Sequence, residues 1–406
     1  MLAAIVLGTA SPAEASAPRV DPVARPHAAD QSLHPVVAPQ PADARFTPRP
    51  PIFRAPGNRL RREVFGFAPY WVLGTQDQWD LGLLTTIAYF GLDVGADGRL
   101  LTTTPGWSGW NSARLTALVA RAHARGVRVV LTIKQFDEAT INRIVTDPAA
   151  TATAVDQVVA AIAARGLDGV NVDFEGHSDA AFPQIQAGTT RFMAGLWNRV
   201  HRRWPGAEMS LDTYTGSASW DGGIFKIGDL APHVDAFFVM AYDMAASNMP
   251  GRAGPNAPLT GFTYNDTDAV AQYLTRAPAS KVILGVPYFG YKSSTDGSGL
   301  YARQTGAQAP DSYADILEDY RCAGLQRSFD GRSGTPWTAW VSPSHGDPCG
   351  GNRGSWRQLY YDDAASLGLK YDLVNARGLR GAGMWALGYD GASRDLWNEL
   401  AAKFAS

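Results

Sequence analysis

The sequence predicts an α/β protein built as a (β/α)8 barrel, and three observations lead to this fold class. Short runs of β-branched and aromatic residues alternate with longer, alanine-rich stretches that have a helical period. Eight such short runs occur over about 340 residues, which is the strand number and chain length of a barrel of this type. A doubly wound open sheet would show the same alternation, but no GxGxxG or P-loop motif follows an early run.

Each expected strand is a short apolar run, and together they are Val64–Trp71, Thr86–Leu92, Arg128–Lys134, Gly169–Glu175, Glu208–Tyr214, Ala236–Tyr242, Val282–Tyr288 and Gly381–Leu387. The clearest helical patterns between them are Ser112–Arg125, Ala150–Arg165, Thr189–Arg203 and Thr267–Arg276. One connection is too long for a simple crossover. We therefore expect an inserted subdomain over about 291–356, on the loop face where barrels build their sites.

Composition excludes several classes of protein. The chain has 406 residues, is 45% hydrophobic and carries 36 basic against 38 acidic residues, so it is neither disordered nor fibrous. The formal charge of −2 gives no indication of a nucleic-acid partner. The 12 Trp, 15 Tyr and 16 Phe suit a buried core, but they also suit stacking on the flat faces of sugars.

The amino-terminal region indicates export. Residues 1–17 combine a short apolar run with the small residues that signal peptidase prefers, although a disordered alanine-rich tail would look similar. No basic residues precede the run, so the true start can lie upstream. Residues 18–60 are rich in Pro and Ala and are expected to form an extended linker before the barrel domain, 61–406. No stretch of eighteen apolar residues predicts a membrane span. We expect a secreted protein.

The two cysteines, Cys322 and Cys349, both lie in the expected insertion. They form no CxxC pair and have no histidine cluster at zinc-ligand spacing beside them. In a cytosolic protein they would be two unrelated thiols. In an exported protein they would form a disulfide, which is the pairing we expect.

The strongest local signal is the run Asp168–Glu175. Because side chains alternate along a strand, Asn171, Asp173 and Glu175 share one face while the apolar residues share the other. The apolar face must pack against helices, so the three polar groups point into the barrel and towards its carboxyl-terminal rim. Buried polar groups need partners. A hydrogen-bond network, ligation of a hard metal ion, and a general acid at Glu175 are the three interpretations of this triplet.

These residues resemble the DGxDxDxE signature of glycoside hydrolase family 18, the chitinases and related endo-β-N-acetylglucosaminidases. Three further segments are similar to the first, sixth and eighth strands of that family, namely Gly66–Trp71, Met240–Asp243 and Gly383–Trp385. The resemblance covers about residues 64 to 405. It implies the same barrel, and a glycosidase that cleaves β-1,4-linked N-acetylglucosamine (GlcNAc) glycans and needs no cofactor and no metal.

One position departs from the family pattern, because Asn171 replaces its first inward carboxylate. A subset of the family with this Asn, resembling chitobiase-like and spore-cortex-lytic enzymes, is active. Two close carboxylates share a proton, whereas an Asn amide donates a hydrogen bond and favours ionised Asp173. The change affects the expected pH profile and widens the expected substrates to other GlcNAc glycans.

The resemblance also implies roles for individual residues. Glu175 is the general acid and then the base, Asp173 accepts the acetamido N–H, and Tyr242 positions the acetamido oxygen. The mechanism is retaining and substrate-assisted, which is an exception to the two-carboxylate scheme. Residues expected to bind the sugar are Trp385, Asp243, Met240, Tyr70, Phe90 and Tyr214. Further aromatic residues that lie near strand ends and can line the cleft or simply pack are Trp71, Tyr89 and Tyr288.

Some interpretations stay open at this point. Trp337 and Trp340 are either sugar-stacking platforms or the small core of the insertion, and Asp212 is a candidate for the polar interior. The expected partner is a GlcNAc-containing oligosaccharide or polysaccharide, with no nucleic acid and no membrane span, and we expect a monomer. The alternatives are a peptidoglycan or spore-cortex N-acetylglucosaminidase, and a catalytically silent carbohydrate-binding barrel.

Overall fold

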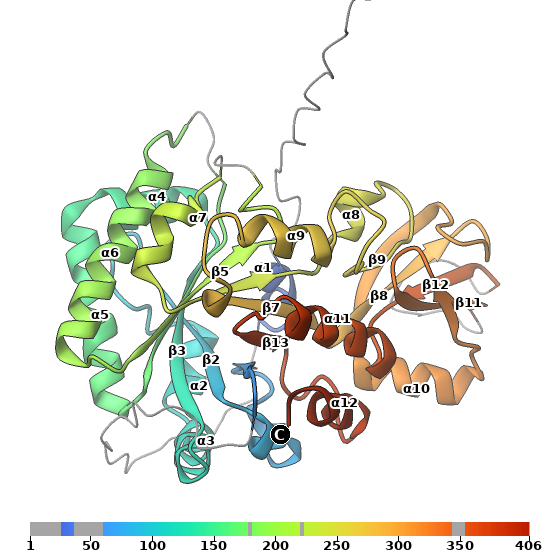
Figure 1. The fold of residues 1–406 in the computed structure, drawn as a ribbon, viewed down its shortest axis with the longest axis horizontal. Helices are drawn as coiled ribbons and strands as arrows, with labels where there is room; N and C mark the ends of the chain where they lie inside the picture. Colours follow the sequence, from blue (N-terminus) through green and yellow to red (C-terminus); the bar gives the residue numbers. More distant parts are fainter. Residues whose placement is uncertain (1–25, 36–59, 178–180, 220–222, 343–353, 406) are drawn as a thin grey trace, which may run out of the picture.

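A closed barrel of eight parallel strands confirms the predicted fold class. The computed structural model describes residues 26–35, 60–177, 181–219, 223–342 and 354–405. The strands follow one another around the barrel in the order β1, β13, β7, β6, β5, β4, β3, β2 (Figure 1). Their bounds are β1 Glu63–Pro69, β2 Thr86–Asp93, β3 Arg128–Gln135, β4 Gly169–Phe174, β5 Glu208–Tyr214, β6 Ala236–Met240, β7 Val282–Pro287 and β13 Gly381–Trp385.

Helices cover the outside of the barrel, with α3, α4, α5 and α6 along one side in Figure 1. Local sequence signals fix their ends. The Ser112 hydroxyl accepts the Leu115 N–H at the start of α3, and Asp147 accepts two N–H groups at the start of α5. The helices are α1 Pro26–Gln31, α2 Pro105–Trp110, α3 Ala113–Ala124, α4 Glu138–Thr146, α5 Pro148–Arg165, α6 Ile185–Arg203, α7 Ile227–Leu230, α8 Ala245–Asn248, α9 Asp266–Tyr273, α10 Tyr313–Ala323, α11 Ala364–Ala376 and α12 Asp395–Phe404, with short 3₁₀ turns at Leu73–Gln78, Leu81–Leu83, Ala231–His233 and Ala279–Lys281.

The expected insertion is an antiparallel sheet that packs with α10 beside the barrel (Figure 1). Its strand order is β10, β11, β12, β8, β9. The bounds are β8 Phe289–Thr295, β9 Gln304–Ser312, β10 Ser328–Asp330, β11 Thr335–Val341 and β12 Trp356–Tyr360. The sheet therefore begins two residues after β7 ends, so that its first strand starts at the carboxyl-terminal rim of the barrel.

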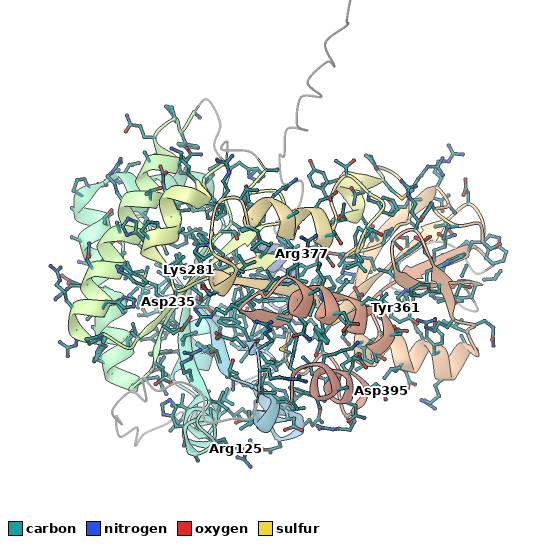
Figure 2. All side chains as sticks on the ribbon, in the orientation of Figure 1. Arg125, Asp235, Lys281, Tyr361, Arg377 and Asp395 are labelled. Carbon is teal, nitrogen blue, oxygen red and sulfur yellow. The ribbon has the colours of Figure 1, made fainter. Side chains whose placement is uncertain are left out.

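The barrel interior is filled in layers. At the floor, Arg128 and Arg380 form ion pairs with Glu63 and Glu208, which lie at the starts of β1 and β5. Above them is an aromatic layer around Phe238. A Cβ on Gly383 or Gly285 would lie 2.5 Å from Phe238 Cε2 or from the Val239 carbonyl oxygen, so these two strands need glycine for the ring to fit. Figure 2 shows the dense packing inside the barrel, with Arg125 at the periphery.

Part of the expected linker is ordered, which corrects the prediction that all of residues 18–60 are extended. Pro26–Gln31 form the short helix α1, which lies at the centre of the barrel in Figure 1. The linker composition gave no apolar period, and local propensity alone would not stabilise a helix of this length. Contacts with the barrel residues, described below, hold it in place.

Several predictions fall outside the described residues and stay predictions. These are the signal peptide, residues 1–17, and the disulfide, because Cys349 and the side chain of Cys322 are not described. Within the described part of the chain, no helix is both long enough and apolar enough to cross a bilayer.

Candidate active site

Strand β4 brings the polar triplet into the barrel as the alternation predicts. Asn171, Asp173 and Glu175 are each fully buried. Phe174, on the opposite face, packs against Phe192 of α6 with ring centroids 5.5 Å apart. Asp168, the first residue of the signature, lies at the other end of the strand, where its carboxylate accepts the Val129 N–H at 2.7 Å. It therefore joins β4 to β3.

Asn171 is held in one orientation by two partners on β5. Its Nδ2 donates to Asp212 Oδ2 at 2.8 Å, and its Oδ1 accepts from Ser210 Oγ at 2.8 Å. Asp212 in turn forms a hydrogen bond with Asp173. The structure thus confirms Asp212 as part of the polar interior, and it joins β4 and β5 through buried side chains.

The upper part of the triplet converges on an imidazole from α1. His27 Nδ1 lies 3.0 Å from Asp173 Oδ2, and His27 Nε2 lies 2.7 Å from the Tyr242 hydroxyl. The His27 N–H donates to Glu175 Oε1 at 2.9 Å, and the Ala28 N–H donates to Oε2 at 3.4 Å. Tyr242 comes from the end of β6, so one small group is bound by residues from two strands.

Burial determines the protonation states in this site. It raises the pKa of Glu175, and the neighbouring Asp173 raises it further. Burial also raises the pKa of Asp173, against the nearby Lys134 ammonium, which lowers it. The pKa of His27 falls to about 4 because burial outweighs the attraction of Glu175 and Asp30. At neutral pH His27 is a neutral imidazole, with one ring nitrogen as donor and the other as acceptor.

Aromatic rings enclose this imidazole. Trp385, at the end of β13, stacks on His27 with ring centroids 3.8 Å apart and an interplanar angle of 18°. Phe90 and Phe67 contact it at 5.5 and 5.0 Å. Trp385 Nε1 also donates to Asp30 Oδ2 at 2.7 Å. Trp385 is thus a flat floor with a polar edge, which is the arrangement that suits a pyranose ring.

The inserted sheet contacts this site through two residues of β8: the ring of Phe289 packs edge-on against Tyr242 with ring centroids 5.9 Å apart, and Tyr291 contacts Asp243. Tyr291, on β8, forms a hydrogen bond with Asp243, which lies three residues after the end of β6. Burial raises the pKa of Asp243 to about 7, and this hydrogen bond opposes the rise. The backbone of Asp243 has φ of 60°, and its N–H donates to Asn256 Oδ1 at 2.8 Å. The insertion thereby positions one residue of the barrel rim.

Of the remaining predicted residues, some lie near the rim or the N-terminal segment, and others lie on the helix side of the barrel. Tyr70 contacts the N-terminal segment through its hydroxyl, which donates to the His34 carbonyl at 2.9 Å. Met240 is two residues beyond the inward Phe238 on β6, and in the β5–β6 register it lies opposite Tyr214, which packs near Phe225. Two other aromatic residues lie on the helix side of the barrel: the Tyr89 hydroxyl donates to Gly106 of α2, and Tyr288 packs beside Tyr371 of α11.

Trp337 and Trp340 lie on opposite faces of β11, because they are three residues apart on a strand. Trp337 stacks on Tyr360 with ring centroids 5.8 Å apart, and Lys292 lies over Trp340 at 6.0 Å. They do not form a joint platform. Both rings contribute to the packing of the inserted sheet.

His27, Asp173 and Glu175 also form a donor set of the kind that holds a metal ion. Both ring nitrogens of His27 are already in hydrogen-bonding contact with protein groups, and two backbone N–H groups point at Glu175. These contacts occupy both His27 ring nitrogens, Asp173 Oδ2 and the Glu175 carboxyl group with protein partners, so the donor set is engaged in hydrogen bonds in this structure.

Sequence reasoning missed the contribution of α1. His27 and Asp30 lie in a segment dominated by Pro and Ala, and their only signal was a short run of helix-forming residues after Pro26. A contact across 146 residues, such as His27 to Asp173, leaves no trace in local sequence. Sequence reasoning also missed Tyr389, because this residue lies in a turn after the last strand of the barrel.

The fold and the site together define a class of protein. A (β/α)8 barrel with a buried carboxylic acid, a second carboxylate and a tyrosine around a tryptophan floor is the arrangement of a barrel glycosidase. The chain matches the model of the glycosyl hydrolases family 18 over residues 64–390. It belongs to this family and is a glycosidase.

Relatives and solved structures agree with this assignment. The chain is 29% identical over 287 residues to di-N-acetylchitobiase of Rattus norvegicus, covering 66% of this chain and 72% of that protein. It is 26% identical over 318 residues to di-N-acetylchitobiase of Homo sapiens, covering 70% and 76%. A chitinase of Cycas revoluta, solved in complex with (GlcNAc)3, has the same fold with a TM-score of 0.71 at 17% identity, covering 84% of this chain and 99% of that structure.

Proposed function

We propose that the protein hydrolyses β-1,4-linked GlcNAc glycans with retention of configuration, by a substrate-assisted mechanism. The observation that carries this proposal is the convergence of Glu175, Asp173 and Tyr242 on one small planar group that lies flat on Trp385. A neutral imidazole offers one N–H and one lone pair. An acetamido group offers the same two functions through its N–H and its carbonyl oxygen.

The reaction needs one acid that later acts as a base. Glu175 donates its proton to the glycosidic oxygen as the bond to the anomeric carbon breaks. The carbonyl oxygen of the substrate's acetamido group attacks that carbon and forms an oxazolinium ion. Water then attacks the same carbon and gives its proton to the Glu175 carboxylate, which restores both the acid and the original anomeric configuration.

The neighbouring residues stabilise the attacking group. Asp173 accepts the acetamido N–H, and its negative charge offsets the positive charge that develops on the ring. Tyr242 donates to the acetamido oxygen and holds it in line with the anomeric carbon. Asn171 lies one layer deeper and acts on Asp173 through Asp212.

The similar proteins support this substrate class. Two of them are named di-N-acetylchitobiase, and one chitinase structure holds (GlcNAc)3. We place the reaction outside the cell on the basis of the apolar run in residues 1–17.

Substrate assistance predicts selectivity for the acetamido group. The protein should cleave chromogenic β-glycosides of GlcNAc and should leave the matching β-glucosides intact, because these lack the internal nucleophile. Asp173→Ala and Tyr242→Phe should lower kcat more than they raise KM. A thiazoline that imitates the oxazolinium ion should inhibit competitively. Equal rates on glucosides, or a trapped covalent ester on the protein, would contradict the mechanism.

The product profile separates chitin from peptidoglycan as the source of the substrate. Mass spectrometry of the products from soluble chitooligosaccharides and from purified peptidoglycan should show faster release from the chitooligosaccharides. Faster release from peptidoglycan would move the proposal to the cell-wall N-acetylglucosaminidases, without changing the roles of the residues.

A further inference from the structure

We propose that the candidate active site is also a binding site for a peptide of this same chain, residues 26–35, which occupies the cleft as a pseudo-substrate and holds the enzyme in a latent state. These ten residues are called the docked segment below. That the docked segment takes the place of a GlcNAc sugar rests on the proposed function. That the segment binds in the cleft does not.

The inner end of the docked segment occupies the place where the chemistry is expected. His27 is fully buried, and its ring nitrogens contact Asp173 and Tyr242 at 3.0 and 2.7 Å. We assign the ring proton to Nδ1, which faces the carboxylate, so that Nε2 accepts the Tyr242 hydroxyl proton. This is the polarity of an acetamido N–H and carbonyl. The Glu175 carboxyl group accepts two backbone N–H groups and is therefore withdrawn from any glycosidic oxygen.

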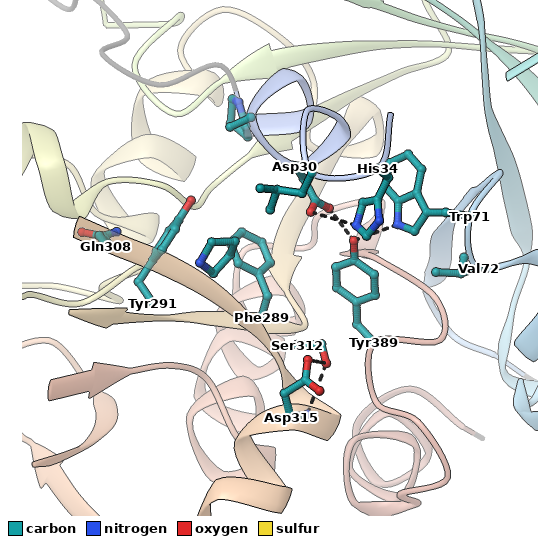
Figure 3. A pocket seen from close by; sticks show the side chains of 14 residues that line it. Asp30, His34, Trp71, Val72, Phe289, Tyr291, Gln308, Ser312, Asp315 and Tyr389 are labelled. Atoms are coloured by element: carbon teal, nitrogen blue, oxygen red, sulfur yellow. Dashed lines mark hydrogen bonds and ion pairs between the residues drawn. The ribbon is translucent and has the colours of Figure 1, made fainter. Parts of the chain in front are cut away.

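The outer end is anchored by side chains of three different loops and strands. The carboxylate of Asp30 accepts from Trp385 Nε1 and from the Tyr389 hydroxyl, the second of which is visible in Figure 3. His34 stacks on Trp71 with ring centroids 4.5 Å apart and an interplanar angle of 15°. Its carbonyl accepts from the Tyr70 hydroxyl at 2.9 Å. The segment thus uses the aromatic residues that a sugar would stack on.

A groove continues beyond the docked segment. A cavity of about 490 Å³ lies between Asp30, Trp71, Tyr389 and the first strands of the inserted sheet (Figure 3). The segment lines this cavity along one side. It therefore fills the innermost part of the cleft and leaves the outer part open, where the next sugar of a longer glycan can bind and compete for the inner position.

The length of the connecting chain allows the segment to bind in its own molecule. Leu60 pairs with Ala405 near the floor of the barrel, and β1 begins three residues later. The connection between Pro35 and Leu60 can extend to about 80 Å, whereas a strand of seven residues such as β1 is about 23 Å long. A tethered peptide has an effective concentration in the millimolar range, so modest affinity is enough for high occupancy.

Competition between segment and substrate gives a kinetic signature. Substrate must displace the segment, so the intact chain should show a raised KM and an unchanged kcat at saturation. His27→Ala and Asp30→Ala, made in the full chain, should each raise kcat/KM for a soluble GlcNAc oligosaccharide about tenfold or more, through a lower KM. Ser32→Ala is the matched control, because the Ser32 hydroxyl donates to the Ala29 carbonyl within the segment itself, and this variant should leave kcat/KM unchanged.

A peptide in trans tests the same site directly. A synthetic peptide with the sequence of residues 24–36 should inhibit the His27→Ala full chain competitively, and the same peptide with Ala in place of His27 should not. Equal kcat/KM for the wild-type chain and both segment variants, together with no inhibition by the peptide, would overturn the proposal.

A readout without turnover separates this proposal from the proposed function. In the docked state the pKa of His27 is about 4, whereas a free segment would have the ordinary value near 6.5. NMR titration of the full chain, with His27 assigned by comparison with the His27→Ala spectrum, should show the low value. A His27 that titrates near 6.5 means that the cleft does not hold the segment. A low value in a chain without activity on GlcNAc substrates would support docking and count against the proposed function alone.

A second, independent observation concerns position 171, where this chain has Asn and the family pattern has a carboxylate. We infer that Asp212 is a positioning residue that holds a proton shared with Asp173. The two carboxyl groups are buried and hydrogen-bonded to each other, and such a bond requires that one of them carries a proton. Among the described residues, neither Asp173 Oδ1 nor Asp212 Oδ1 receives a hydrogen bond from a donor group.

The position of Asn171 explains where this proton lies. Its amide donates to Asp212 Oδ2 at 2.8 Å, whereas Asp212 Oδ1 receives no donor from the described residues, so we assign the shared proton to Asp212 Oδ1. Asp173 then accepts on Oδ1 and keeps Oδ2 as an acceptor towards the group bound in the cleft. The family pattern places this carboxyl on β4, two residues before Asp173, whereas this chain supplies it from β5.

Exchange of the two side chains tests this assignment. Asp212→Asn should lower kcat about tenfold with little change in KM and should alter the pH profile, since Asp173 loses its proton donor. The double variant Asn171→Asp with Asp212→Asn returns a carboxyl to β4 and should recover most of kcat. Asp266→Asn, at a buried carboxylate that faces Lys370 away from the site, is the control for loss of a buried acid. An unchanged kcat in Asp212→Asn, or a double variant no faster than the single one, would overturn the inference.

Discussion

At the scale of single residues, the site depends on how strongly burial changes ordinary side chains. Glu175 is an acid whose pKa is raised first by burial and then by Asp173. His27 is a histidine that burial keeps neutral. Exposed residues of the same types would be ionised carboxylate and partly charged imidazole at neutral pH. Burial therefore keeps Glu175 protonated, so that it can donate a proton, and keeps His27 neutral, so that its imidazole can bind beside Glu175.

Replacement of Glu175, the general acid, should remove most of the catalytic activity and the alkaline limb of the pH–rate profile. Glu175→Gln should lower kcat by about a hundredfold or more, because Gln cannot donate a proton to the leaving oxygen. In the wild-type enzyme kcat/KM should fall as pH rises through the pKa of Glu175, since the donor is then lost. The measurement is a pH–rate profile from about pH 4 to pH 9. A Glu175→Gln chain that folds normally and keeps the wild-type alkaline limb would exclude this residue as the acid.

At the scale of elements, the inserted sheet is part of the site as well as an addition to the barrel. Its first strand, β8, starts at the rim and places Tyr291 against Asp243. Its packing residues, including Trp337 and Tyr360, build the small core that keeps β8 in place. Of the two interpretations of Trp337 and Trp340, the structure favours packing within the insertion, and β8 contacts the site through Phe289 and the Tyr291 hydroxyl.

Removal of that hydroxyl should weaken substrate binding. Tyr291→Phe deletes a hydrogen bond that lowers the pKa of Asp243, so Asp243 should be more protonated at neutral pH and a poorer acceptor for sugar hydroxyls. We expect KM for chitooligosaccharides to rise about tenfold, with a smaller change in kcat. Tyr320→Phe, on α10 and outside the cavity lining, is the matched control and should leave KM unchanged. A KM that rises equally in both variants would assign the effect to general loosening of the insertion.

At the scale of the whole molecule, stability and catalysis occupy opposite ends of the barrel. The floor holds an ion-pair cluster of two arginines and two glutamates, and the rim holds the acids of the site. Burial would raise the pKa of Glu63, but Arg380 and Arg128 outweigh it and hold the pKa below its usual range. The glutamates at the floor are thus paired with arginines, whereas the carboxyl groups at the rim are available for catalysis.

Glu63, one of the two glutamates of the floor cluster, should make stability depend on pH in one direction. Because the pKa of Glu63 is lowered by folding, its contribution is present above the unfolded value of about 4.5 and is lost as pH falls through the lower folded value. Glu63→Gln should therefore cost about 3 kcal/mol at pH 7 and clearly less below pH 4, seen as a Tm difference that shrinks with pH. Asp97→Asn, in an exposed pair with Arg99, should change Tm little at either pH. A Glu63→Gln cost independent of pH would show that packing, and not charge, is lost.

The sequence by itself determined the barrel and the inward triplet. The periods of 3.6 and 2 residues are local properties, and the alternation of Asn171, Asp173 and Glu175 with apolar residues is visible in the eight letters of Asp168–Glu175. The places of Trp385 and Tyr242 in the site came from the resemblance of Gly383–Trp385 and Met240–Asp243 to strands of the family. The pattern that predicted a helix over Ser112–Arg125 includes Ser112, the residue that caps α3, whereas α5 begins at Pro148, two residues before the expected start at Ala150, because Asp147 caps it.

Only the tertiary structure decided which distant groups complete the site. The pairing of Asn171 with Asp212 joins residues 41 positions apart, and His27 reaches Asp173 across 146. These contacts form between side chains whose local sequence carries no period and no motif, so nothing near them in the chain records the partner. They exist because closing the barrel brings β4, β5 and β6 around one buried space, where low dielectric makes an unpaired polar group costly and therefore selects the groups that can pair.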